Sequence, residues 1–289
     1  MIKAKSILPI FFVSILLMEA VSFASSGAPI YLPLILRPFS RPGFGVLETS
    51  HGTIVYQEGV TLAAAQEVGA GFEDAHQVVG EDLGYPEGRP RLYVYRSLDD
   101  LLNDLINTWH YPEWFRTYQA IPRMNKNYEA WIPPNMAGWF IGHEYSHRII
   151  ERVAGLNSQT KYKWFDEGLA EHEGLRTWAV RSPLEAETAR QNYWNQVKTG
   201  FQSGQWIALQ ALTTESQWTA QMSTPNKDWI YLEAAVVVDY LIAQKGLSQV
   251  KAVLIKVGSG TPFADAFQQV FGRTVDQFEA EFKAYLISH

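Results

Sequence analysis

The sequence predicts an α+β fold, in which a lobe of mixed strands and helices (residues 44–135) precedes a mostly helical lobe (residues 136–289). Two observations support this class. Short apolar runs bounded by turn signals dominate the first part, whereas longer segments with helical spacing and capping residues dominate the second. Of the 289 residues, 47% are hydrophobic and 19% are charged, so the chain can bury a core and is not expected to be disordered.

A signal peptide is predicted at the N-terminus. Lys3 and Lys5 precede an apolar run over residues 7–18, and a zone of small residues offers a cleavage site after Ala24. The apolar run is shorter than the roughly 20 residues of a membrane span. We therefore expect residues 1–24 to be removed during export, leaving a secreted or extracytoplasmic protein without stable membrane insertion. An uncleaved N-terminal membrane anchor is the alternative.

The first lobe is expected to hold a small sheet of antiparallel type with helices between its strands. A linker over residues 25–43, interrupted by Pro33, leads into this lobe. Alternating residues on both sides of His51-Gly52 predict a hairpin, and Ser97 with an acidic residue three positions later predicts a helix start. The expected strands lie within residues 44–57, at 91–95 and, as a pair, within 117–134, the second of the pair being 128–132; a helix is expected over 62–79.

Helices are expected throughout the second lobe. Ser182-Pro183-Leu184-Glu185 is a strong start signal, because it combines an N-cap serine, a proline at the first helical position and a glutamate at the third. Glycines follow several of the periodic segments and are typical helix ends. The expected helices cover residues 136–153, begin near 164, run over 183–198 and 230–244, and begin again at 275.

Charge and cysteine content exclude several classes of function. The chain has 24 Lys and Arg against 30 Asp and Glu, a net charge of -6, whereas nucleic-acid binders normally present a basic face. We therefore expect no nucleic-acid partner. The absence of cysteine rules out a disulfide scaffold, a thiolate metal site and a cysteine nucleophile. Nothing in the sequence indicates the oligomeric state.

One segment carries a metal-binding pattern, His143-Glu144-Tyr145-Ser146-His147, inside a helical stretch. Histidines four residues apart lie on one helical face, so both imidazoles can bind the same metal ion. Glu144 lies beside the first of them and can accept a proton during hydrolysis. This HExxH segment predicts a metal site with His143 and His147 as ligands and Glu144 as general base.

The following helix offers a third ligand. A catalytic zinc site needs three protein ligands and an open fourth position. Nineteen residues separate His147 from Glu167, enough for a loop and a second helix to return to the metal. Glu171 is one turn later on the same face. Ligating histidines usually donate their other N–H to a carboxylate, so Glu171 is expected to orient His143.

The HExxH motif followed by the segment WFDEGLAE at residues 164–171 resembles the gluzincin metallopeptidases, the thermolysin-like group. It is similar in particular to the peptidase MA-like subfamily, whose members carry a WxxEGLAE-type segment. The resemblance covers the order of elements from about residue 45 to the C-terminus and is motif-specific over 143–171. It implies a zincin-like fold with the HExxH helix at the cleft, and one Zn²⁺ per chain bound by His143, His147 and Glu167.

Other segments agree with the family or depart from it. The stretch from Asp228 to Tyr231 is similar to the family's Tyr-led helix, which implies Tyr231 as the oxyanion donor; Tyr240 and His172 are the alternatives. The Gly-x-Met-Glu-Asn segment of classical aminopeptidases is absent, which speaks against aminopeptidase activity in particular. His172 stands where family members usually carry an aromatic residue. The strand at 128–132 either binds an extended peptide by strand addition or is an ordinary strand.

These features together predict a secreted zinc metallopeptidase that hydrolyses peptide bonds in a peptide or protein substrate. An alternative from another class is a catalytically silent, zinc-stabilised surface protein that binds peptide or glycan. A third reading is a zinc hydrolase acting on a non-peptide amide. The sequence leaves cleavage specificity, and the choice between endo- and exopeptidase, open.

Overall fold

The computed structural model describes residues 41–288 except 87, 120, 134–137 and 156–161. The described residues belong to one compact unit, Pro33–His289. The predicted signal peptide, most of the predicted linker and the predicted lobe boundary at residue 135 lie outside the described residues. In chain order the elements are β1 (Phe44–Glu48), β2 (Thr53–Gln57), α2 (Leu62–Asp82), β3 (Arg91–Val94), α3 (Leu98–Asn107), α4 (Trp114–Tyr118), β4 (Glu129–Ile132), α5 (Trp139–Ala154), α6 (Lys163–Ala179), α7 (Pro183–Gln202), the 3₁₀ helix η2 (Leu209–Leu212), α8 (Glu215–Met222), α9 (Lys227–Lys245), α10 (Leu247–Gly258), α11 (Phe263–Phe271) and α12 (Val275–Ser288).

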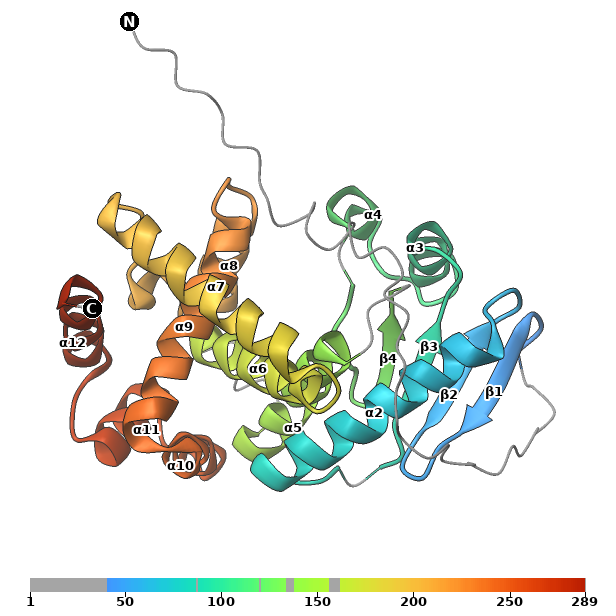
Figure 1. Ribbon diagram of the computed structural model, residues 1–289, viewed down its shortest axis with the longest axis horizontal. Helices are drawn as coiled ribbons and strands as arrows, with labels where there is room; N and C mark the ends of the chain where they lie inside the picture. Colours follow the sequence, from blue (N-terminus) through green and yellow to red (C-terminus); the bar gives the residue numbers. More distant parts are fainter. Residues whose placement is uncertain (1–40, 87, 120, 134–137, 156–161, 289) are drawn as a thin grey trace, which may run out of the picture. The chain divides into compact units, whose positions relative to one another are not determined.

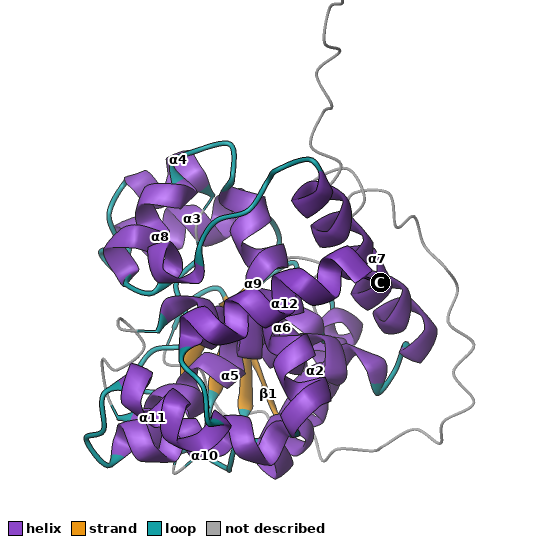
Figure 2. Cartoon of the chain, turned by 90° about the vertical axis from the view of Figure 1, so that its left-hand side faces the viewer, coloured by secondary structure: helices purple, strands orange, loops and turns teal. Residues whose placement is uncertain are grey.

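The architecture is α+β, with a small sheet near the N-terminus and a helical C-terminal region, as Figures 1 and 2 show. The sheet has the strand order β1-β2-β3-β4. β1 and β2 pair antiparallel on either side of His51-Gly52, which confirms the expected hairpin. The expected antiparallel type is wrong for the remainder, because β2, β3 and β4 pair in parallel. Parallel neighbours need long crossover connections, and α2 and the α3–α4 pair provide them.

The two faces of the sheet are covered by different helices. Ile54, Leu92 and Ala130 are side by side in the strand register and are fully buried. They face α2, where a Cβ atom at Gly69 would lie 3.5 Å from the Ile54 side chain. The next residue of each strand points the other way and joins a buried cluster with α3 and α4; this cluster includes Val55, Tyr93, Trp131, Leu101, Leu105 and Phe115. The sheet is therefore buried on both sides.

Of the two strands expected within 117–134, the described residues of this segment form one. β4 confirms the second strand, and it lies at an edge of the sheet. Before it, the described residues contain the short helix α4 and a turn but no strand. The Asn125 side-chain oxygen accepts hydrogen bonds from the backbone N–H groups of Asn127 and Glu129, which bends the chain as asparagine commonly does. Met124, in this turn, is buried although it belongs to no strand.

The expected helices are present, with some ends displaced. α9 ends at Gly246, whose φ of 81° fits the predicted glycine cap. α7 instead runs through Gly200 to Gln202. Gly200 packs against the indole of Trp229, where a Cβ atom would come within 2.2 Å, so this glycine serves a helix contact and not a cap. None of the helices in the described ranges is long and apolar enough to cross a membrane.

Helices α5 and α6 lie at the centre of the helical arrangement. In Figure 1 they lie between the sheet and the C-terminal helices. α5 contacts β4, α2 and α10, whereas α6 contacts α7, α9 and η2, and the two helices pack on each other. Elements from the N-terminal and the C-terminal parts of the chain therefore pack against the two helices that carry the metal-binding pattern.

Candidate metal centre

Two glycine contacts bring α5 and α6 unusually close. A Cβ atom at Gly142 would lie 2.4 Å from Thr177 Oγ1, and one at Gly174 would lie 2.8 Å from the carbonyl oxygen of Trp139. Only glycine fits at such distances, because real Cβ atoms do not come closer than about 3 Å to non-bonded neighbours. The close approach lets a glutamate on α6 reach histidines on α5.

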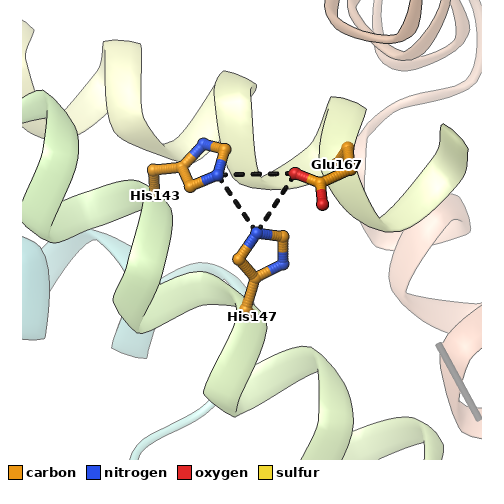
Figure 3. Close-up of side chains that lie close together, drawn as sticks. All are labelled: His143, His147 and Glu167. Carbon is orange, nitrogen blue, oxygen red and sulfur yellow. Dashed lines mark hydrogen bonds and ion pairs between the residues drawn. The ribbon is translucent and has the colours of Figure 1, made fainter. Parts of the chain in front are cut away.

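His143 and His147 on α5 and Glu167 on α6 converge on one point (Figure 3). The two Nε2 atoms are 3.1 Å apart, and Glu167 Oε2 lies 3.5 Å from His143 Nε2 and 3.3 Å from His147 Nε2. Ligands at about 2.0–2.1 Å from a tetrahedral zinc ion are about 3.3–3.4 Å from one another. The three distances therefore match three corners of a zinc coordination tetrahedron.

Hydrogen bonding alone does not account for this cluster. All three side chains are buried, with relative exposures of 6%, 2% and 3% for His143, His147 and Glu167. The contacts of Glu167 Oε2 with the imidazole nitrogens of His143 and His147, at 3.5 and 3.3 Å, are long for hydrogen bonds. A cation at the centre of the triangle would satisfy this buried oxygen better than these long contacts do. Within the described part of the chain, no other group of three or more His, Cys, Asp and Glu residues has this spacing.

The carboxylates around His147 favour the protonated form of its imidazole. Burial and the charge of Arg123 lower the pKa of this imidazole, but the carboxylates of Asp166 and Glu167 outweigh them and raise the pKa to about 10. A ligating imidazole must be neutral, so metal binding at neutral pH would release this proton.

Each imidazole has a carboxylate on the side away from the triangle. His147 Nδ1 is 3.0 Å from Asp166 Oδ1, and His143 Nδ1 is 3.5 Å from Glu171 Oε1. The indole N–H of Trp139 donates to the other oxygen of Glu171 at 3.2 Å. Glu171 thus lies beside His143, as expected from the sequence. Asp166 was not predicted from the sequence, although its position directly before Glu167 is a signal that could have indicated it.

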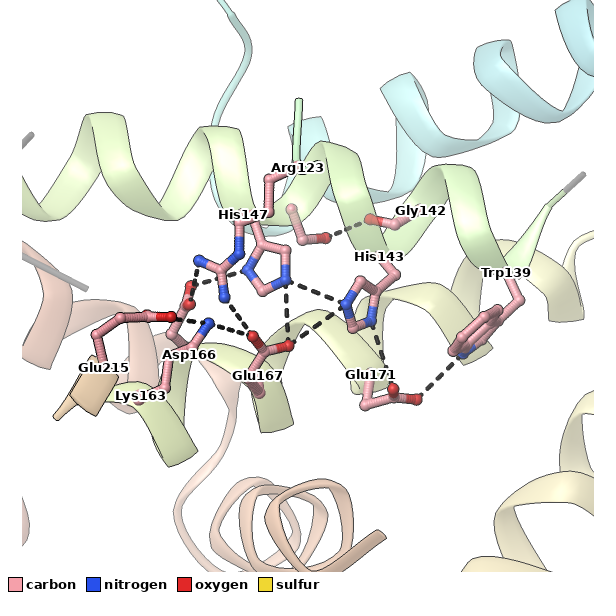
Figure 4. Close-up of polar contacts among 11 residues, drawn as sticks. Arg123, Trp139, Gly142, His143, His147, Lys163, Asp166, Glu167, Glu171 and Glu215 are labelled. Atoms are coloured by element: carbon pink, nitrogen blue, oxygen red, sulfur yellow. Dashed lines mark hydrogen bonds and ion pairs between the residues drawn. The ribbon is translucent and has the colours of Figure 1, made fainter. Parts of the chain in front are cut away.

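Two cations lie on the outer side of Glu167 (Figure 4). Arg123 and Lys163 both donate to Glu167 Oε1, and Arg123 Nη1 also donates to Asp166 Oδ2 at 2.8 Å. Sequence reasoning missed both cations. Lys163 is one helical turn before Glu167, which is a recognisable (i, i+4) ion-pair pattern. Arg123 comes from the turn before β4 and has no sequence signal.

Glu144 is buried next to the triad of His143, His147 and Glu167. Its exposure is 8%, and its Oε2 atom has no hydrogen-bond partner. Burial raises the pKa of Glu144, and the neighbouring charges of His143 and His147 partly offset this rise. A carboxyl group with an upward-shifted pKa and a free oxygen is suited to accept a proton and pass it on.

The three candidates for the oxyanion donor lie in different surroundings. Tyr231 packs edge-on against Trp218, and its pKa is raised by burial and then by the negative charge of Glu167. Tyr240 packs against aromatic rings of α12. His172 Nδ1 lies 3.4 Å from Asp239 Oδ1.

Comparison with known proteins adds no family assignment. No protein-family model matches the chain, and no curated protein has significant sequence similarity to it.

Proposed function

We propose that this protein is a zinc-dependent metallopeptidase of the gluzincin type, with a zincin-like arrangement of α5 and α6 around the metal. The observation that carries the proposal is the spacing of 3.1–3.5 Å among the ligand atoms of His143, His147 and Glu167, all three of which are buried side chains. The resemblance of the HExxH and WFDEGLAE segments to gluzincins supports the same function.

The donor set favours zinc. Two imidazoles and one carboxylate without thiolates form a common catalytic zinc site, and one such group in the described residues corresponds to one ion per chain. Hard cations such as Mg²⁺ and Ca²⁺ prefer oxygen ligands throughout. Two histidines among three ligands therefore argue for zinc over these ions.

Each side chain around the triad has a separate role in hydrolysis. Zinc, when bound, supplies Lewis acidity that makes water nucleophilic near neutral pH and polarises a carbonyl group. Glu144 accepts the proton of the attacking water and delivers it to the leaving amine. Tyr231, through its hydroxyl, donates to the oxyanion of the tetrahedral intermediate. Asp166 and Glu171 hold the imidazoles of His147 and His143 in the orientation that ligation requires.

The substrate in this proposal is a peptide or protein outside the cytoplasm. β4 is an edge strand and its helix neighbour is α5, so an extended peptide paired with β4 would lie next to the triad. The charged, apolar and small-residue pattern of residues 1–24 supports export.

A glutamine substitution tests the proposal. Glu144→Gln keeps the size and polarity of the side chain but removes the base, so peptide turnover should fall by about 10²–10⁴-fold while zinc content stays at one per chain. Peptide-library cleavage, with and without a chelator, and elemental analysis measure the two quantities. Glu151→Gln is the matched control, because Glu151 is on the same helix in an ion pair with Arg148.

The possible results separate the candidate functions. Full turnover in Glu144→Gln would refute the assigned base. Zinc bound by the wild type without cleavage of any peptide would support the silent binding protein. Cleavage confined to non-peptide amides would support the third reading.

A further inference from the structure

Arg123 connects the outer partners of two metal ligands. One terminal nitrogen of its guanidinium donates to Asp166, which in turn is 3.0 Å from the Nδ1 atom of His147. The other terminal nitrogen donates to Oε1 of Glu167. Arg123 lies on the turn before β4, whereas the residues it binds are on α6, so one side chain ties the sheet region to the triad (Figure 4).

Lys163 reinforces the same oxygen. Its ammonium group donates to Glu167 Oε1 and lies 3.6 Å from Glu215 Oε2 on α8. Lys163 is buried, with a relative exposure of 3%. Oε1 of Glu167 is therefore occupied by two cations, and Oε2 is left facing His143 and His147 at 3.5 and 3.3 Å.

The two buried cations beside Glu167 are electrostatically unfavourable for metal binding. Two positive charges next to a ligand of a divalent cation repel that cation, and burying an arginine and a lysine is itself unfavourable. A glutamate can bind a metal through one oxygen or through both. With both cations on Oε1, the carboxylate can offer only Oε2, and this oxygen is turned toward the imidazoles.

We propose that Arg123 is a positioning residue that holds Glu167 as a one-oxygen ligand and, through Asp166, fixes the ring of His147, so that the metal keeps four-coordinate geometry with an open position. The inference rests on the proposed metal centre, but it does not require that the substrate be a peptide. The planar guanidinium is suited to this bridge, since it can bind two carboxylates in a fixed geometry whereas an ammonium is a point charge.

Arg123→Lys in the full chain tests this role with the charge unchanged. Lysine cannot bridge Asp166 and Glu167 as the guanidinium does, so zinc affinity should fall about 10-fold or more, the usual effect of losing an outer partner. The dissociation constant is measured by competition with a chromogenic chelator. Visible absorption of the Co²⁺-loaded chain reports geometry independently of activity: four-coordinate Co²⁺ absorbs strongly, and the band should weaken severalfold if Glu167 becomes a two-oxygen ligand.

Arg190→Lys is the matched control, because Arg190 also binds two carboxylates, Glu187 and Asp239, away from the triad. It should bind zinc and Co²⁺ as the wild type does. If Arg123→Lys does not fold, Asp166→Asn breaks one arm of the bridge, keeps an oxygen for His147 and should show the same two changes.

The outcomes distinguish this proposal from the proposed function. Zinc affinity and Co²⁺ absorption in Arg123→Lys, or in the substitute Asp166→Asn, that equal those of the wild type would overturn the positioning role and leave the peptidase proposal intact. A wild type that binds both metals but cleaves no peptide would refute the peptidase and leave the positioning role standing. A wild type that binds neither metal would overturn both.

Discussion

Helices α5 and α6 bury one set of carboxylates, and helices α9 and α12 bury another, with very different surroundings. On α9, Glu233 Oε2 accepts from the indole N–H of Trp229 at 2.6 Å and from the backbone N–H of Ile207 at 3.2 Å. On α12, Glu279 accepts from the indole N–H of Trp206 and the backbone N–H of Leu209. These bonds fasten the segment that contains η2 to the two helices.

The two sets of carboxylates differ in their charge and in the groups that surround them. Burial raises the pKa of Glu233 to about 8, so this carboxyl is neutral at pH 7 and acts as a structural acceptor. In contrast, the pKa of Glu167 is held well below its usual range: burial opposes ionisation, but the charges of Arg123 and His147 outweigh it. Burial and a shifted pKa therefore occur at both places. Of the two places, and within the described residues, only the triad brings possible ligand atoms from two helices to metal-coordination spacing.

The largest expected effect separates the two regions by metal binding. Glu167→Gln removes the anionic ligand oxygen, and zinc affinity should fall by more than about 100-fold, beyond the usual loss for an outer partner. Glu233→Gln is the matched substitution in the other region and should leave zinc affinity unchanged. Chelator competition measures both. A fall in zinc affinity of less than tenfold in Glu167→Gln, or an equal fall in Glu233→Gln, would contradict the proposed difference between Glu167 and Glu233.

A smaller effect is expected where the two regions share a helix contact. Gly168 on α6 faces α9, and a Cβ atom there would lie 2.2 Å from the carbonyl oxygen of Ala234, next to Glu233. Backbone cannot move aside as a side chain can, so Gly168→Ala should destabilise the fold by about 1–3 kcal/mol and also weaken zinc binding through the adjacent Glu167. Urea unfolding of the metal-free chain measures the first quantity.

Gly69→Ala is the control for that substitution. Gly69 is also helical, but its added Cβ would meet only side chains, the nearest being the Thr49 methyl group at 3.0 Å. The better helix propensity of alanine, about 1 kcal/mol, should offset that contact. A Gly168→Ala chain as stable as the wild type would show that α6 and α9 can separate without cost.

The sequence predicted the convergence of His143, His147 and Glu167 better than it predicted the residues and strands around them. Helical spacing alone puts His143 and His147 on one face, and the fold class follows from local patterns. The parallel pairing of β2, β3 and β4 could not be read locally, because short buried strands show the same apolar pattern in either direction. Arg123 could not be found for a similar reason: its partners, Asp166 and Glu167, are more than forty positions away and only the fold brings them together.

The smallest expected effect concerns the pH dependence of stability in the α9–α12 region. The pKa of Glu233 is raised by burial to about 8 in the folded chain, against 4.5 as its ordinary value. The folded state therefore holds this proton more tightly than the unfolded state, and its contribution to stability is full below about pH 4.5 and is lost as the pH rises through 8.

The Glu233→Gln variant tests this pH dependence, because its side chain cannot ionise and therefore lacks this loss of stability. The unfolding free energy of the variant relative to the wild type should therefore increase by about 1.4 kcal/mol between pH 6 and pH 7, where the unfolded chain has lost this proton and the folded chain still holds it. Urea unfolding of both chains across this range measures the difference, in which the titration of other groups cancels. A difference that stays constant with pH would mean that Glu233 is ionised in the fold, and the contrast between a neutral structural carboxyl and an ionised ligand would then be wrong.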